Sequence, residues 1–526
     1  MPFTITDDAA QAVRHRVVLV YPTISGKALS REALQSLASV PRQGGTLIGF
    51  GVEGGGLEPV FGFESAIADR TRSEIRLDVS TPVTAEFNDP DERTIRINDM
   101  GVLAYLKPSG VLAAYDNGAA AIVHRAVGSG HAYAFGVDLG FFLLKGYNHR
   151  QQGISRSYAN GFEPALDVLL RLVRNIYEQG EPDAVTLGTV AGGRPLTVIL
   201  THDVDYTRSI VNGLEYARHQ QAEGIRGTYF IQTKYVRDWN DDAFFNPRGI
   251  DAVKALAGLG AEIGSHSVSH SRVFSKFPLG DGQESYPSYR PFVRDAERTS
   301  GGTILGELRV SRFLLERVAG APRLTSFRPG YLELPFALPQ ALEATGYRYS
   351  SSQSANTSLT HLPFRLAYDR GTAAQTAVYE FPITVEDELP PRMGDRLPQA
   401  LELARRISRY GGLFVVLSHP DVLDHKLEFQ KGLVRALKGR ATFASLDEFG
   451  AWWVARDQIT WRVTRERSRR TLTLDAAQPL DGLPVRVPAG WRYAGAQPAT
   501  EVRQSGRTLL IAQAKGKIAL QFQAAE

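Results

Sequence analysis

The sequence predicts a mixed α/β protein with three parts. These are an open α/β sheet domain over residues 1–190, a parallel (β/α) barrel over residues 195–455 and a small antiparallel β domain over residues 456–526. Strand and helix patterns alternate in the first part, βα patterns repeat through the second, and β-prone runs follow Trp452 and Trp453. The length of 526 residues also exceeds the usual capacity of a single core.

The first part begins with apolar runs of strand length at residues 16–20 and 45–50, separated by a helical pattern at residues 30–37. A later pair of runs, at residues 119–123 and 131–135, is joined by a glycine-containing turn and predicts a hairpin. The first part is therefore predicted to be an open α/β sheet with a β extension.

This arrangement resembles the flavodoxin-type, glutamine-amidotransferase-like domains found beside carbohydrate enzymes. The resemblance rests on the run Gly128-Ser-Gly-His-Ala-Tyr-Ala-Phe-Gly-Val-Asp-Leu-Gly140. Active members of that family use a cysteine nucleophile, and this chain has no cysteine. The resemblance therefore implies a domain that is not catalytic in that way.

A Gly-Gly-Arg-Pro turn at residues 192–195 marks the start of the second part. Short β-rich runs then follow at residues 195–200, 227–231, 262–264, 326–328, 379–381 and 413–417. Helix-period segments lie between them, such as residues 304–318, where leucine and phenylalanine recur at helical spacing. Repeated βα units of this kind favour a closed or nearly closed parallel barrel.

The third part changes to short or alternating β-prone runs separated by glycine and proline turns. They lie at residues 471–475, 485–487, 508–512 and 518–522. This pattern is typical of a small antiparallel β domain.

Composition excludes several classes of function. Lys and Arg number 60 against 56 Asp and Glu, so the formal charge of +4 does not indicate a nucleic-acid partner. The absence of cysteine removes disulfides, thiolate zinc sites and cysteine nucleophiles. No apolar run reaches the length of a transmembrane segment, and the first residues lack a signal-peptide pattern. We therefore expect a cytoplasmic protein, or a periplasmic or extracellular one from which a leader was removed.

Two pairs of polar residues outline a divalent-metal site. Asp203 and Asp205 come just beyond the apolar run at residues 195–200, and His266 and His270 are four residues apart. Histidines at this spacing on a helical turn project from one face, and one carboxylate from a distant strand end completes a three-ligand site with open positions. This set of two nitrogens and one oxygen suits zinc.

These motifs identify the second part as similar to the NodB-type polysaccharide deacetylases, the carbohydrate esterase family 4 enzymes with a distorted (β/α) barrel. Thr201-His-Asp-Val-Asp205 resembles the first family motif with one inserted position, and His266-Ser-Val-Ser-His270 matches the second. The resemblance implies that Asp203 is the general base and that Asp205, His266 and His270 hold the metal.

Two further runs resemble later motifs of the same family. In Ser326-Phe-Arg-Pro-Gly-Tyr331, the resemblance implies that Arg328 holds the base carboxylate. In Val415-Val-Leu-Ser-His-Pro420, it implies that His419 protonates the leaving amine. The family also has an acidic residue that orients this histidine, and either Glu386 or Asp387 is a candidate for that role.

The resemblance implies a metal-dependent hydrolase that removes N-acetyl groups from an amino-sugar polysaccharide, such as an exopolysaccharide. The expected cofactor is Zn²⁺, with Co²⁺ or Ni²⁺ as alternatives, and the expected partner is an acetylated poly- or oligosaccharide. Two other interpretations remain open. One is hydrolysis of another C–N bond, in peptidoglycan or a small amide, and the other is glycan binding without catalysis.

One long segment is expected to overhang this site. Residues 272–291 carry four aromatic residues among glycines and prolines. Their rings are candidates for stacking on sugar rings or for the ordinary packing of a long loop.

Overall fold

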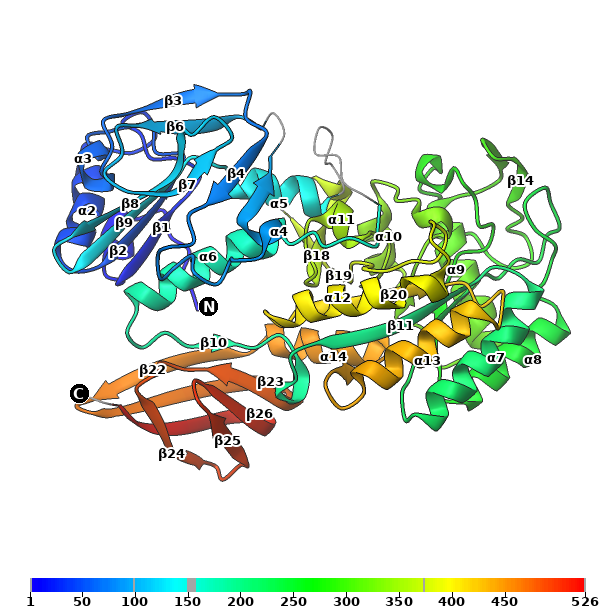
Figure 1. Cartoon of the computed structure of the whole chain (residues 1–526). Coiled ribbons are helices and arrows are strands. Elements are labelled where there is room, and N and C mark those ends of the chain that lie inside the picture. The colour runs from blue at the N-terminus through cyan, green and yellow to red at the C-terminus, as the bar shows by residue number, and fades with distance from the viewer. Residues whose placement is uncertain (1, 98–99, 149–157, 372–373, 525–526) are drawn as a thin grey trace.

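The computed structural model describes residues 2–524 except 98–99, 149–157 and 372–373. Its strands form three large sheets and one two-stranded ribbon. Figure 1 shows the first sheet in blue, the middle sheet with its helices in green to orange, and the last sheet in orange to red apart from its blue-green strand at residues 186–187. None of the described helices is long and apolar enough to cross a membrane.

The first sheet is mixed. Its strands are β1 (Val17–Val20), β2 (Thr46–Phe50), β3 (Ser65–Asp69), β4 (Glu74–Leu77), β5 (Thr94–Arg96), β6 (Val102–Leu106), β7 (Val111–Tyr115), β8 (Ala120–Val127) and β9 (Gly130–Phe135). β1, β2 and β9 pair in parallel, and β8 and β9 form the predicted hairpin. The other described pairings in this sheet are antiparallel, so the β extension is larger than the parallel part. The likeness to an amidotransferase stays a prediction.

Helices cover both faces of the first sheet. They are α1 (Ala9–Ala12), α2 (Arg31–Arg42), α3 (Glu58–Phe61), α4 (Pro90–Arg93), α5 (Leu139–Tyr147) and α6 (Ala165–Gly180). Side chains of α2 and α3 share one apolar core with the sheet, and side chains of α5 and α6 share another. An α/β layer of this kind forms because each face of the sheet is apolar and must be buried.

The middle sheet is largely parallel. Its strands are β11 (Thr197–Val204), β12 (Thr228–Ile231), β13 (Glu262–Ser265), β16 (Ser326–Phe327), β17 (Tyr349–Ser350), β18 (Phe364–Ala367), β19 (Gln375–Glu380), β20 (Leu413–Ser418) and β21 (Thr442–Phe443). They follow the order β18-β19-β17-β16-β13-β12-β11-β20, with β21 beside β11 and only β18 antiparallel. An isolated bridge joins Val385, just after β19, to Val416 of β20. The chain beyond β19 therefore returns to the opposite end of the sheet.

Helices connect these strands. They are α7 (Thr207–Ala222), α8 (Pro247–Gly258), α9 (Ile304–Phe313), α10 (Leu338–Ala344), α11 (Ala355–Ser358), α12 (Leu397–Ser408), α13 (His425–Leu437) and α14 (Leu446–Asp457). The predicted helix at residues 304–318 is α9 followed by a π-helical turn, η3 (Leu314–Val318). Short 3₁₀ turns are η1 (Ala191–Gly193), η2 (Phe274–Lys276), η4 (Gly330–Leu332), η5 (Tyr368–Arg370) and η6 (Met393–Arg396). The ribbon consists of β14 (Phe292–Asp295) and β15 (Arg298–Ser300).

One detail of the middle part differs from the sequence prediction, and one alternative that the sequence left open is favoured. β11 continues to Val204, so Asp203 lies within the strand and not beyond it, because residues 201–204 pair with β12. In the segment at residues 272–291, Phe274 and Tyr289 are buried, whereas Tyr286 is 44% exposed. Two of the four aromatic side chains therefore pack inside the protein, which favours loop packing for these two.

The last sheet is antiparallel, as predicted. Its strands are β10 (Thr186–Leu187), β22 (Thr460–Glu466), β23 (Arg469–Arg486), β24 (Trp491–Gln497), β25 (Val502–Ser505) and β26 (Thr508–Ala524). The four predicted runs belong to only two long strands, β23 and β26, which pair along their length with a register shift between Ala476 and Leu480. β10 precedes the middle part in the chain yet pairs with β23.

Candidate metal and catalytic site

The polar residues singled out in the sequence meet at the carboxyl ends of the middle strands. Asp203 is the penultimate residue of β11 and Asp205 follows the strand. The other residues follow β13, β16 and β20, namely His266, His270, Arg328 and His419. Because parallel strands end at the same edge, residues far apart in the chain come together there.

Asp205, His266 and His270 form a buried cluster whose ligand atoms lie within 4.8 Å of one another. The distance from Asp205 Oδ1 is 3.3 Å to His266 Nε2 and 3.6 Å to His270 Nε2. Among the described residues, this buried Asp205 oxygen accepts no hydrogen bond. A buried carboxylate oxygen without a donor, facing two imidazole nitrogens, fits a divalent cation such as zinc.

The histidines do not lie on a helical turn, which corrects the sequence prediction. Residues 266–270 form an irregular loop after β13, and Ser267 and His270 have positive φ angles of 66° and 52°. These angles are incompatible with a right-handed helix. The side chains converge because the loop bends, and not because of helical spacing.

A buried glutamate on α9 holds this loop. Glu307 Oε2 accepts hydrogen bonds from the backbone N–H groups of Val268 and Ser269, at 2.7 and 2.8 Å. The hydroxyl of Tyr289 donates to the other carboxylate oxygen at 2.8 Å. Sequence reasoning missed Glu307, because a glutamate in a helix usually faces solvent and no local pattern marks this one.

Contacts with residues that follow β16 orient both histidine rings. His266 Nδ1 lies 2.8 Å from the backbone oxygen of Arg328, so Nδ1 donates and Nε2 faces Asp205. The ring of His270 packs so closely on Gly330 that a Cβ there would lie 2.4 Å from His270 Cδ2. Burial lowers the pKa of His270 to about 4, so the ring is neutral at pH 7, the form that binds a metal.

Charge stabilises Asp205 as an anion. Burial raises the pKa of its carboxyl group, but the imidazoles of His270, His266 and His419, which are protonated at the acid pH where this group titrates, outweigh burial and hold this pKa well below its ordinary value. The carboxylate is therefore available as a ligand across the neutral pH range.

Asp203 is paired with a buried arginine. Its Oδ1 lies 2.7 Å from Arg328 Nη1, and its Oδ2 is 4.0 Å from His266 Nε2. The guanidinium of Arg328 also donates to Thr201 Oγ1 and to the backbone and side-chain oxygens of Ser351. One oxygen of Asp203 is thus held by Arg328, while the other faces the metal-ligand cluster.

His419 lies on the other side of Asp205, with Nε2 3.4 Å from Asp205 Oδ2. Its Nδ1 is 2.8 Å from Asp387 Oδ1, and its backbone N–H donates to Asp387 Oδ2 at 2.7 Å. Burial lowers the pKa of His419, but Asp387 and the other nearby carboxylates outweigh it and raise this pKa well above its ordinary value. Of the two acidic candidates, the structure therefore brings Asp387 to His419, whereas Glu386 bonds to Asn160.

Residues 193–350 match the model of the polysaccharide deacetylase family. The matched region includes both aspartates, both metal-site histidines and Arg328, whereas Asp387 and His419 lie beyond its end. No curated protein matches the chain. The chain therefore contains a region similar to the polysaccharide deacetylase family within a larger α/β protein.

Several solved structures are similar to the chain at low identity. A structure described as a novel carbohydrate deacetylase is 11% identical with a TM-score of 0.39, covering 97% of this chain and 91% of that one. A family 4 carbohydrate esterase from Streptomyces lividans in complex with acetate is 17% identical with a TM-score of 0.29, covering 48% and 93%. The chitin deacetylase of the fungal pathogen Colletotrichum lindemuthianum is 14% identical with a TM-score of 0.30, covering 49% and 89%.

Proposed function

We propose that this protein is a divalent-metal-dependent hydrolase that removes N-acetyl groups from an amino-sugar polysaccharide. One observation carries the proposal. Asp205, His266 and His270 converge as a buried ligand set. Close to this set lie Asp203, which is paired with Arg328, and His419, which is paired with Asp387. The match of residues 193–350 to the polysaccharide deacetylase family supports the same chemistry.

Hydrolysis of an acetamide requires activation of the carbonyl and protonation of the leaving nitrogen, because the carbonyl is a poor electrophile and the amine is a poor leaving group. Asp205, His266 and His270 would hold the cation, and a bound Zn²⁺, Co²⁺ or Ni²⁺ supplies Lewis acidity that polarises a carbonyl and acidifies water. Asp203 Oδ2 accepts the proton of the attacking water, while the ion pair of Oδ1 with Arg328 orients this carboxylate.

His419 supplies the second proton transfer. Asp387 binds its Nδ1–H and stabilises the charged ring, so the proton on Nε2 is the one available to the leaving nitrogen. Base and acid thus face different members of the ligand cluster, Asp203 facing His266 and His419 facing Asp205. We further propose that residues 195–455 form the catalytic domain, and that the domains at residues 1–190 and 456–526 have no chemistry of their own.

The test is acetate release by the purified protein from acetylated chitooligosaccharides, N-acetylgalactosamine polymers and peptidoglycan, with the metal content measured in parallel. We expect bound divalent metal and release from at least one glycan. Asp203→Asn should lower the rate at least about 100-fold and retain the metal, whereas His266→Gln should lose both.

Wild-type rates in Asp203→Asn would contradict the assignment of the base. Glycan affinity without metal or acetate release would identify a binding protein. Cleavage of a small cyclic amide, with all the glycans left intact, would place the activity on another C–N bond.

A further inference from the structure

Residues 158–164, which lead into α6, run along the middle part of the molecule, beside the chain that carries Asp387. Asn160 joins the two. Its backbone N–H donates to the oxygen of Thr384 at 3.0 Å, and its backbone oxygen accepts from Gln399 Nε2 at 3.1 Å. Asn160, which lies outside the deacetylase-family match, thus pairs with Thr384. Thr384 is three residues before Asp387, the partner of the proposed proton donor His419.

The Asn160 side chain makes a reciprocal pair of hydrogen bonds with Glu386. Asn160 Nδ2 donates to Glu386 Oε1 at 2.6 Å, and the backbone N–H of Glu386 donates to Asn160 Oδ1 at 3.0 Å. Glu386 is only 1% exposed, and its Oε2 accepts the backbone N–H of Glu388 at 2.7 Å. The Glu386 carboxylate therefore holds the backbone just after Asp387, and Asn160 holds the backbone N–H just before it.

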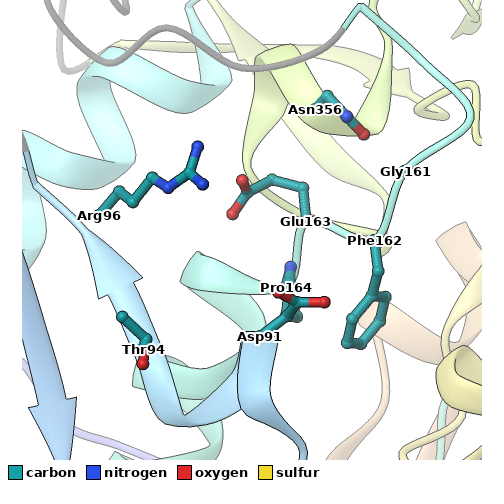
Figure 2. A pocket seen from close by; sticks show the side chains of 8 residues that line it. All are labelled: Asp91, Thr94, Arg96, Gly161, Phe162, Glu163, Pro164 and Asn356. Carbon is teal, nitrogen blue, oxygen red and sulfur yellow. The ribbon is translucent and has the colours of Figure 1, made fainter.

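The surrounding segment is anchored by its neighbours. The ring of Phe162 lies 4.2 Å from the Arg406 guanidinium and stacks on His361, and the N–H of Glu163 donates to His361 Nε2 at 3.2 Å. Figure 2 shows this stretch, from Gly161 to Pro164, along one wall of a polar pocket opposite Thr94 and Arg96 of β5. The pocket lies between the first sheet and the middle part.

The backbone of Asn160 also suits its residue type. Its φ angle is 64°, in the left-handed region that asparagine tolerates better than most residues. The side chain is required for the pair with Glu386 and the conformation favours asparagine or glycine, so two independent constraints act on one position.

We propose that Asn160 is a positioning residue for the proton donor. It fixes Glu386, and Glu386 fixes the backbone of Asp387, which orients His419. This inference rests on the proposed function, and it gives residues 158–164 a role in positioning the proton donor without chemistry of their own.

Exchanging donor and acceptor tests the proposal. Asn160→Asp puts two carboxylates in contact. Glu386→Gln makes the side-chain amide of residue 386 face the amide donor of Asn160. Each single variant therefore breaks the reciprocal pair of hydrogen bonds between residues 160 and 386. In the double variant the new amide at position 386 can donate to the new carboxylate at position 160, and the pair re-forms with the roles reversed. We expect kcat to fall at least about tenfold in each single variant, with KM and metal content little changed, and to recover in the double variant.

Asn175→Asp is a matched control, because Asn175 Nδ2 donates to Glu86 Oε1 at 2.7 Å far from the site. It should lower stability without lowering kcat. Asn160→Gly, which keeps the left-handed backbone and removes only the side chain, replaces Asn160→Asp if the latter does not fold.

Urea unfolding of the four proteins in the exchange gives the coupling between the two positions independently of activity. Coupling in stability with wild-type kcat in both single variants would mean a merely structural role and would overturn the proposal. Reduced kcat in the single variants without recovery in the double variant would also overturn it. A wild-type protein that releases no acetate would remove the proposed function and this inference with it.

Discussion

Asp203 and Asp205 show how neighbours separate the roles of two identical residues. They stand two apart at the end of one strand, so their side chains leave the same face. Arg328 binds the first carboxylate, whereas imidazoles surround the second. Arg328 itself is fully buried, and removing one partner of such a pair costs about 3–5 kcal/mol. The pairing therefore matters for stability as well as for the proposed chemistry.

Gly330 offers a test of the site at the scale of one methyl group. Gly330→Ala should push the His270 ring out of place, because a Cβ would lie 2.4 Å from His270 Cδ2. We expect the metal affinity to fall at least about tenfold, as measured by competition with a metal chelator. Gly258→Ala on α8 is the control, since a Cβ there meets no described atom within 4 Å. Unchanged metal affinity in Gly330→Ala would mean that the ring can move without cost.

At the scale of elements, the metal-ligand loop after β13 depends on a helix that contributes no ligand. α9 presents Glu307 to two backbone N–H groups of the loop, and these bonds satisfy donors that the irregular backbone would otherwise leave buried and unpaired. The positive φ angles of Ser267 and His270 are thus held by long-range contacts.

Removing this support should loosen the ligands. Glu307→Ala is expected to weaken metal binding about 10- to 100-fold and to lower the free energy of unfolding, with Glu307→Gln less severe because one acceptor remains. Titration of the metal-free protein with Zn²⁺ and urea unfolding measure the two effects. Glu215→Ala, on a half-exposed side chain of α7, is the control. Metal affinity equal to wild type in Glu307→Ala would contradict the supporting role.

The end of β19 predicts a pH dependence of stability. Burial raises the pKa of Glu380 from 4.5 to about 7, although backbone N–H groups of Ser352 and Gln353 bond its carboxylate. Because the folded state holds this proton more tightly than the unfolded state, the stabilisation is complete below pH 4.5 and is lost as pH rises through about 7.

Glu380→Gln should remove this contribution. We expect the difference in unfolding free energy between Glu380→Gln and wild type to be constant below pH 4.5 and to shift in favour of the variant by up to about 3 kcal/mol above pH 7. Urea unfolding at a series of pH values measures it, with Glu215→Gln as the surface control. A difference that does not change with pH would show that the Glu380 carboxyl group titrates alike in both states.

At the scale of the whole molecule, the parts are joined by polar contacts as well as by the chain. Asp167 of α6 is buried and accepts hydrogen bonds from Thr360, His361 and Tyr410 of the middle part. Figure 1 shows α6 on the side of the first sheet that faces the middle part. The first sheet is therefore held against the middle part through charged and polar groups buried between them.

Asp167→Ala should weaken this junction. Three buried donors lose their acceptor, so the free energy of unfolding is expected to fall by roughly 3 kcal/mol or more, while the metal site is unaffected. Urea unfolding and metal content measure the two effects. Asp183→Ala, which breaks ion pairs with Arg465 and Arg470, is the control and should cost about 1 kcal/mol or less. An equal loss in the two variants would contradict a special role for the buried junction.

Local patterns were sufficient for much of this protein. The apolar runs predicted most of the middle strands, and the short motifs at residues 203–205 and 266–270 picked out side chains that the structure brings together. These features could be predicted because strand periodicity and the common edge of parallel strands depend on neighbouring residues and on general topology.

Contacts between distant segments could not be predicted from local sequence patterns. The sequence left Glu386 and Asp387 as equal candidates, predicted a helical turn at His266 to His270, and contained no sign of Glu307 or Asn160 as supports. Each of these depends on which buried backbone and side-chain groups meet once the strands are in register. Short motifs thus indicate which residues form the candidate site. Their orientation depends on the requirement that every buried polar group find a partner in the folded chain.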